Sequence, residues 1–291
     1  MSATSLALEG VRLIGRRPVS TLIWSLLMGL WVGGFMAGLF FGITIIRDAA
    51  DWTEGDFARP FGVFLAIWFG TMCVTLVLFS VLQCAIYRSV LDPRARAFAY
   101  LRFGPVEGGM LVLQLVFLVV MAILEFGGFA VVISVSYAPL LLWVKILIGT
   151  AVVATCLSAF CILGARLALA GPRLVSVGRL DLGGAWTLSR GHFWTLLGMA
   201  VLAMALSSVF SMIAQLILNI ALAPLTPVLM TPHGLPRFDP SMLRALAPLL
   251  GLIVAMAGVT FALQFVVFLA PFAAAYRALS GADELKTSGP A

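Results

Sequence analysis

Residues 106–135 read VEGGMLVLQLVFLVVMAILEFGGFAVVISV, and only Glu107 and Glu125 carry charge in this stretch. A helix needs about 20 apolar residues to cross the hydrocarbon core of a bilayer, so the stretch is long enough to span one. Its apolar residues do not alternate with polar residues, as a strand of a transmembrane barrel would require. The stretch therefore predicts a transmembrane helix.

Five further stretches have the same character: 20–46, 61–87, 139–165, 192–222 and 243–276. Over the whole chain of 291 residues, 62% of the side chains are apolar and 10% are charged, whereas a soluble domain has about 45–50% and about 25%. This composition excludes a soluble enzyme, a disordered chain and a nucleic-acid-binding domain. We expect an all-α, polytopic bundle of six transmembrane helices that forms one domain over residues 1–291, with short interfacial amphipathic helices on the cytoplasmic side.

The basic residues predict the orientation of the spans. Thirteen of the 18 lysines and arginines lie before span one, between spans two and three, between spans four and five, or after span six. Loops on the cytoplasmic side carry the excess of positive charge. We therefore expect a protein of the cytoplasmic membrane with both termini in the cytoplasm.

A basic segment precedes each pair of spans, at 5–17, 91–104 and 173–190, and an arginine closes each even span: Arg88, Arg166 and Arg277. Two interpretations are open. The chain is a threefold duplication, or each helix that ends at the inner face carries an arginine whose head group reaches the interface.

The third basic segment has the pattern of an interfacial helix, in which Leu174, Val177, Leu182, Ala185, Trp186 and Ser189 can share one face. Asp181 is a suitable N-cap and Gly191 a suitable stop. An ordinary connector is the alternative. Arginines of an interfacial helix can bind anionic lipid. The candidate headgroup contacts in this and the neighbouring segments are Arg94, Arg96, Arg102, Arg173, Arg179, Arg190 and His192.

Two further sets of residues are candidates for interactions within the membrane. Gly34, Gly38 and Gly42 are spaced by four residues, which allows close helix packing within the chain, in a homo-oligomer or with a partner helix. Glu125 and Lys145 are both predicted near the outer boundary, where they can form an ion pair or reach the interface separately. Glu107 is expected to pair with Arg102 or Arg88.

Catalytic chemistry has no visible basis in the sequence. His192 and His233 are predicted on opposite sides of the membrane, so they cannot share a metal ion. The four cysteines lie in apolar segments without a CxxC pattern, which favours a packing role. Nucleotide-binding and hydrolase motifs are absent. We therefore expect no catalytic residue, no metal and no cofactor.

The stretch from Arg166 to Leu202 resembles a pattern found in six-span bacterial inner-membrane families, which include the membrane domain fused to some glycerophosphodiester phosphodiesterases. The matching residues are Arg166, Pro172, Trp186, Leu188, Ser189, Arg190 and Gly191. The resemblance implies a six-span fold in the bacterial inner membrane and a membrane-associated role. The hydrolase domain of some relatives has no counterpart in these 291 residues, so the resemblance implies no activity and no catalytic residues.

We expect a non-catalytic integral membrane protein that organises anionic membrane lipids or partner proteins and binds no nucleic acid. One alternative is a transporter or channel for a small or lipidic substrate, with a cavity lined by Gln83, Gln114, Gln264 or Glu107. Another is a structural subunit of a larger membrane complex, in which the row of Gly34, Gly38 and Gly42 faces another chain.

Overall fold

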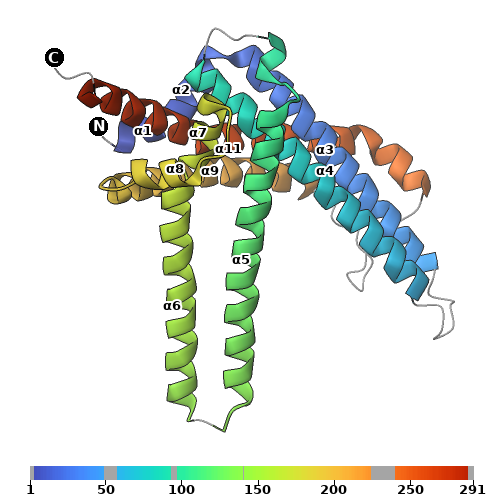
Figure 1. The fold of residues 1–291 in the computed structure, drawn as a ribbon. Helices are drawn as coiled ribbons and strands as arrows, with labels where there is room; N and C mark the ends of the chain where they lie inside the picture. Colours follow the sequence, from blue (N-terminus) through green and yellow to red (C-terminus); the bar gives the residue numbers. More distant parts are fainter. Residues whose placement is uncertain (1–2, 49–57, 93–96, 140, 224–239, 288–291) are drawn as a thin grey trace. The chain divides into compact units, whose positions relative to one another are not determined.

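The computed structural model describes residues 3–48, 58–92, 97–139, 141–223 and 240–287, and within these ranges the chain is helical without a strand (Figure 1). In chain order the elements are α1 (Ala3–Ala7), α2 (Glu9–Arg16), α3 (Pro18–Asp48), α4 (Ala58–Leu91), the 3-10 turn η2 (Ala97–Tyr100), α5 (Pro105–Tyr137), α6 (Leu142–Leu167), α7 (Ala170–Val177), α8 (Leu182–Leu188), α9 (Phe193–Leu222) and α11 (Pro240–Thr287).

Six stretches of the described helices are long and apolar enough to cross a membrane. They are Pro18–Leu39, Phe61–Leu91, Phe98–Tyr137, Leu142–Val177, Phe193–Ile220 and Ala247–Gly281. Each falls on one of the predicted spans, so the all-α fold with six candidate spans is confirmed. The chain is a multi-pass membrane protein.

The chain forms two compact units. Unit 1 comprises Met1–Ala7, Ser80–Leu202 and Leu269–Ala291, and unit 2 comprises Leu8–Phe79 and Ala203–Phe268. Helices α4, α9 and α11 each contribute one part to either unit. Whether the two units act as one transmembrane domain over residues 1–291 stays a prediction.

Unit 1 is built on the antiparallel hairpin of α5 and α6, which lie side by side along their length (Figure 1). α5 begins with Pro105 at its first position, where the missing N–H is not needed. It ends before Ala138, whose backbone is extended because the next residue is Pro139. Local sequence therefore fixes both ends of α5 and the position of the hairpin turn.

Two short helices, α7 and α8, follow α6 at the end of the hairpin opposite its turn (Figure 1). The sequence predicted one face running through this segment, but Gly178 divides it. Gly178 adopts a left-handed conformation with φ of 77°, which ends α7. Asp181 then caps α8 by accepting a hydrogen bond from the Gly184 backbone N–H, as its residue type predicted. Whether these helices lie at the membrane interface stays a prediction.

Unit 2 is held together where α3 crosses α11 and packs on α4. A Cβ on Gly258 of α11 would lie 2.5 Å from the Cα of Gly29 on α3, so the two backbones touch. Beside α4, the indole N–H of Trp31 donates to the Thr75 hydroxyl at 2.9 Å. Close approach at glycines and interhelical hydrogen bonds are typical of packing in membranes.

The predicted glycine row on α3 packs only in part within the chain. A Cβ on Gly38 would meet Ile67 at 3.6 Å, and one on Gly42 would meet Phe64 at 3.7 Å, both on α4. Gly34 faces open space. The row therefore serves mainly the packing of α3 on α4, which weakens the case for a subunit that docks through it.

Candidate functional site

Seven described arginines of unit 1 lie at the end of the α5–α6 hairpin opposite its turn, and we call this set the basic rim. Its members come from the ends of α4 and α6, from the segments before α5 and α9, from α7 and its C-terminal loop, and from α11: Arg88, Arg102, Arg166, Arg173, Arg179, Arg190 and Arg277. They fall into two classes, those bound to other groups of the chain and those exposed.

Arg88 is bound to the first turn of α5. Its Nη1 lies 2.5 Å from Glu107 Oε1 and 3.5 Å from the Tyr100 carbonyl oxygen. The Glu107 side chain is only 6% exposed, so Arg88 neutralises a buried carboxylate. Of the two partners expected for Glu107, the structure places Arg88 beside it.

The arginines that close the other even spans also bind neighbouring segments. The Arg166 guanidinium lies over the Trp186 ring, 5.3 Å from its centroid. Arg277 donates to the Val90 carbonyl oxygen at 3.1 Å. The cation–π contact joins the end of α6 to α8, and the carbonyl contact joins α11 to the end of α4. Whether the shared position of Arg88, Arg166 and Arg277 reflects a threefold duplication stays a prediction.

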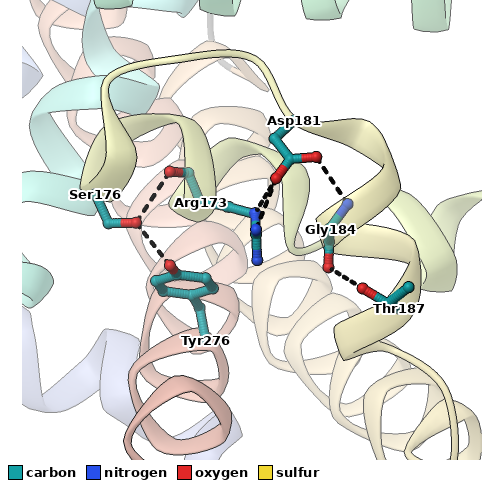
Figure 2. A network of polar contacts seen from close by, with 6 residues as sticks. All are labelled: Arg173, Ser176, Asp181, Gly184, Thr187 and Tyr276. Carbon is teal, nitrogen blue, oxygen red and sulfur yellow. Dashed lines mark hydrogen bonds and ion pairs between the residues drawn. The ribbon is translucent and has the colours of Figure 1, made fainter. Parts of the chain in front are cut away.

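Arg173 on α7 is held by the carboxylate that caps α8 (Figure 2). Its Nε and Nη2 donate to Asp181 Oδ2 at 3.0 and 2.6 Å, while Asp181 Oδ1 accepts from Gly184 N at 2.8 Å. The Gly184 N–H, followed by the Arg173 guanidinium, lowers the pKa of Asp181 below its ordinary value because both stabilise the carboxylate. The two bonds fix the orientation of the guanidinium.

A second contact of α7 reaches α11. Ser176 Oγ lies 2.7 Å from the Tyr276 hydroxyl oxygen and 2.9 Å from the Arg173 carbonyl oxygen (Figure 2). The carbonyl can only accept, so Ser176 gives it its single hydrogen and Tyr276 donates to Ser176. The bond places Tyr276 of α11 next to α7, the helix that carries Arg173.

A cavity of about 290 Å³ lies between these groups. Its lining combines one guanidinium, three hydroxyl groups and one apolar side chain: Arg173, Thr187, Tyr276, Ser280 and Leu188. Thr187 and Ser280 direct their hydroxyl hydrogens to the carbonyls of Gly184 and Arg277. The hydroxyl hydrogens are already given to protein acceptors, so the Arg173 guanidinium is the group of this lining that suits an anionic oxygen-rich ligand such as a phosphate. We call this cavity the Arg173 pocket.

The other predicted headgroup contacts are exposed side chains. Arg102, Arg179, Arg190 and His192 are exposed, and His192 Nδ1 lies 3.3 Å from the Arg190 carbonyl oxygen. Of the five candidates that the structure describes, Arg173 alone lines the pocket. Arg94 and Arg96 lie outside the residues whose side chains the structure describes.

The structure does not bring Glu125 and Lys145 together. Lys145 Nζ donates to the Ser136 carbonyl oxygen at 2.8 Å, and within the described ranges the chain records no ion pair between Lys145 and Glu125. α5 continues to Tyr137, beyond the predicted end of its span. At about 1.5 Å per residue, Glu125 lies about 18 Å from that end, whereas Lys145 is in the first turn of α6.

The polar side chains between α4 and α5 satisfy one another. Gln114 Nε2 donates to Gln83 Oε1 at 2.9 Å, and Ser80 donates to Gln114 Oε1 at 2.9 Å. None of these side chains lines the Arg173 pocket. In the part of the chain that the structure describes, no three His, Cys, Asp or Glu side chains are placed to hold a metal ion.

Three residues of the pocket were not among the sequence-derived candidates: Thr187, Tyr276 and Ser280. Tyr276 and Ser280 are four residues apart and therefore share a face of α11, which is a visible signal. That this face meets α7, which lies about one hundred residues earlier, depends on tertiary packing alone.

Comparison of the chain with protein-family models, curated proteins and solved structures gave no match.

Proposed function

We propose that the chain is a non-catalytic, multi-pass protein of the bacterial cytoplasmic membrane that organises anionic lipid, or partner proteins, through its basic rim. In this proposal both termini and the rim face the cytoplasm. The excess of basic residues at this end of the spans supports that orientation. Membership of the six-span bacterial families is part of the proposal and rests on the motif between Arg166 and Gly191.

The Arg173 pocket is the observation that carries the proposal. The Arg173 guanidinium is held in place by Asp181, and the other described side chains that line the pocket are Thr187, Leu188, Tyr276 and Ser280. Pockets for drug-sized ligands measure about 300–1,000 Å³, so 290 Å³ suits one lipid headgroup with its acyl chains outside. The exposed Arg179 and Arg190 add positive charge on either side of α8 in sequence.

The chain contributes electrostatic attraction and a fixed binding geometry, without a chemical step. Each basic residue near an anionic membrane surface contributes about 1 kcal/mol of binding free energy. Arg173 adds directed hydrogen bonds because Asp181 orients its Nε and Nη2, which leaves the N–H groups of Nη1 available. The expected result is retention of anionic headgroups over zwitterionic ones.

Mass spectrometry of the lipids that remain with the protein after gentle extraction tests the proposal. We expect phosphatidylglycerol or another anionic lipid to be enriched over its share of the bulk membrane. Arg173→Gln should reduce this enrichment, by about fivefold if the residue contributes about 1 kcal/mol. Arg190→Gln is the matched control, since it removes one exposed charge outside the pocket and should have a smaller effect.

Absence of enrichment relative to a six-span membrane protein of equal net charge would contradict the proposal. Equal losses of enrichment in Arg173→Gln and Arg190→Gln would show that anionic lipid binds in response to total charge and not at the Arg173 pocket. Circular dichroism of each variant establishes that the helices are retained.

The transporter and the docking subunit have weaker support. The glutamines proposed for a substrate path, Gln83 and Gln114, bind each other between α4 and α5. The glycines proposed for a docking face, Gly38 and Gly42, lie against α4 of the same chain. Neither feature favours these functions over lipid organisation.

A further inference from the structure

Two contacts define how the α5–α6 hairpin is aligned. Lys145 on α6 lies level with Ser136 on α5, because Lys145 Nζ donates to the Ser136 carbonyl oxygen. Further along, Cys156 Sγ donates to the Leu124 carbonyl oxygen at 3.6 Å. The two contacts are separated by nearly the same number of residues on each helix, so the helices run antiparallel without a large offset.

The charges of α6 show where this hairpin crosses the hydrocarbon core. Lys145 and Arg166 stand 21 residues apart in the sequence, with an uncharged stretch between them. At about 1.5 Å per residue this separation is about 31 Å, close to the core thickness of about 30 Å. Charged side chains prefer the two interfaces, so Lys145 and Arg166 mark the boundaries of the core on α6.

Glu125 then lies close to the middle of the membrane. Glu125 is 11 residues from Ser136, which is about 16 Å along α5. Because Ser136 is level with Lys145, Glu125 lies about 16 Å from the level of Lys145, towards the centre of the membrane. Counting from the predicted span ends placed Glu125 at the outer boundary, but the alignment of the hairpin moves it inward. An ionisable side chain at this depth marks a functional site unless a structural partner accounts for it.

Among the residues that the structure describes, Glu125 has no such partner. Its side chain is exposed on the hairpin surface, and the described residues provide it with neither a hydrogen bond nor an ion pair. Nearby on α5, Ile123 and Phe126 are 67% and 74% exposed, so the carboxylate stands in an apolar surface. An isolated charge in hydrocarbon is unfavourable, and burial against an opposite charge removes much of that penalty.

The chain itself offers no cation at this depth. The apolar stretches of the other spans, 18–39, 61–87, 193–220 and 247–276, contain no lysine or arginine. A second copy would bring one Glu125 towards another, which is repulsive when both are charged. Charge complementarity therefore requires a different chain.

We propose that Glu125 is the recognition point at which the α5–α6 hairpin binds a transmembrane helix of another protein, one that carries a lysine or arginine near its midpoint. The apolar surface around Glu125 packs against that helix, and the ion pair fixes its depth. This interaction is independent of headgroup binding at the Arg173 pocket, which lies at the end of the hairpin.

Association with designed peptides tests this proposal. The purified chain is labelled and reconstituted in phosphatidylcholine vesicles, which carry no net charge that would compete for lysine. The probes are two polyleucine transmembrane peptides with identical ends, one with a central lysine and one without. Energy transfer between chain and peptide should show about tenfold tighter binding of the lysine peptide.

Three variants test whether the preference for the lysine peptide depends on the Glu125 carboxylate. Glu125→Gln should lower the affinity for the lysine peptide to that for the all-leucine peptide, whereas Glu125→Asp should retain the preference. Ser134→Ala is the matched control, because it removes another exposed polar group of α5 whose hydroxyl already bonds the Ala130 carbonyl. It should leave both affinities unchanged.

Equal binding of the two peptides, or a preference that survives Glu125→Gln, would overturn the proposal. Self-association of labelled chains that depends on Glu125 would also overturn it, because a second copy would then occupy the surface. Glu125→Gln removes a charge from an exposed apolar surface, so this variant should fold, and circular dichroism verifies that it does.

Discussion

Arg173 on α7 and Asp181 at the start of α8 are joined through two guanidinium nitrogens, at 3.0 and 2.6 Å from the same carboxylate oxygen. The other oxygen of Asp181 caps α8 through Gly184. One carboxylate thus orders both the α7–α8 turn and the arginine of the pocket. The stability of this segment should therefore depend on the charge of Asp181.

The lowered pKa of Asp181 gives that dependence a definite sign. The pKa of Asp181 in the folded chain lies below its value of about 3.9 in the unfolded chain. The stabilisation by the carboxylate is therefore fully present above the unfolded pKa and is lost as the pH falls through the folded pKa. Asp181→Asn should lower the thermal unfolding temperature at neutral pH. The difference from the wild type should shrink under strongly acidic conditions, and an equal difference at both pH values would contradict this prediction.

The buried pair of Arg88 and Glu107 should be sensitive to the loss of one partner. Glu107→Gln leaves the Arg88 charge without its counterion, which costs about 3–5 kcal/mol for a buried pair. Denaturation in mixed micelles with increasing sodium dodecyl sulfate measures the change. The double variant Arg88→Met with Glu107→Leu should recover much of the loss. A single-variant effect below about 1 kcal/mol would mean that the pair behaves as an exposed one.

The crossing of α3 and α11 predicts opposite outcomes for two glycines. Gly258→Ala places a methyl group 2.5 Å from the Cα of Gly29, and overpacking of this kind costs about 1–3 kcal/mol. Gly34→Ala meets open space and should be neutral or stabilising by up to about 1 kcal/mol, because alanine favours helices. The same denaturation assay compares them, and equal effects would contradict the tight crossing.

The proposed orientation predicts which loops react from which side. A cysteine-free background carries Leu180→Cys in the α7–α8 turn or Tyr137→Cys at the hairpin turn, and both positions are exposed. A membrane-impermeant maleimide should label Leu180→Cys only in inverted vesicles and Tyr137→Cys only in right-side-out vesicles. Labelling of both from one side would contradict the six-span topology.

The helices of this protein were predictable because each span is a long, predominantly apolar stretch that has one stable form in a membrane. Pro105 and Pro139 fix the ends of α5 to within a few residues, and Asp181 was predicted as a cap by its residue type. The predicted span 106–135 accordingly matches α5 at Pro105–Tyr137.

The candidate site was less predictable because it depends on contacts between distant segments. Arg173 was identified by its charge, whereas Tyr276 reaches it only through the packing of α11 on α7. Span ends alone do not give the alignment of the α5–α6 hairpin, which places Lys145 beside Ser136 and not beside Glu125.

The binding of anionic headgroups by the Arg173 pocket is the central claim, and native mass spectrometry of the purified chain tests it most directly. The chain is titrated with short-chain phosphatidylglycerol and with phosphatidylcholine. We predict that the wild type prefers phosphatidylglycerol, that Arg173→Gln lowers this preference by about fivefold, and that Asp181→Asn lowers it as well because the guanidinium is no longer oriented. Equal binding of the two lipids by the wild type, or an unchanged preference in Arg173→Gln, would contradict the central claim.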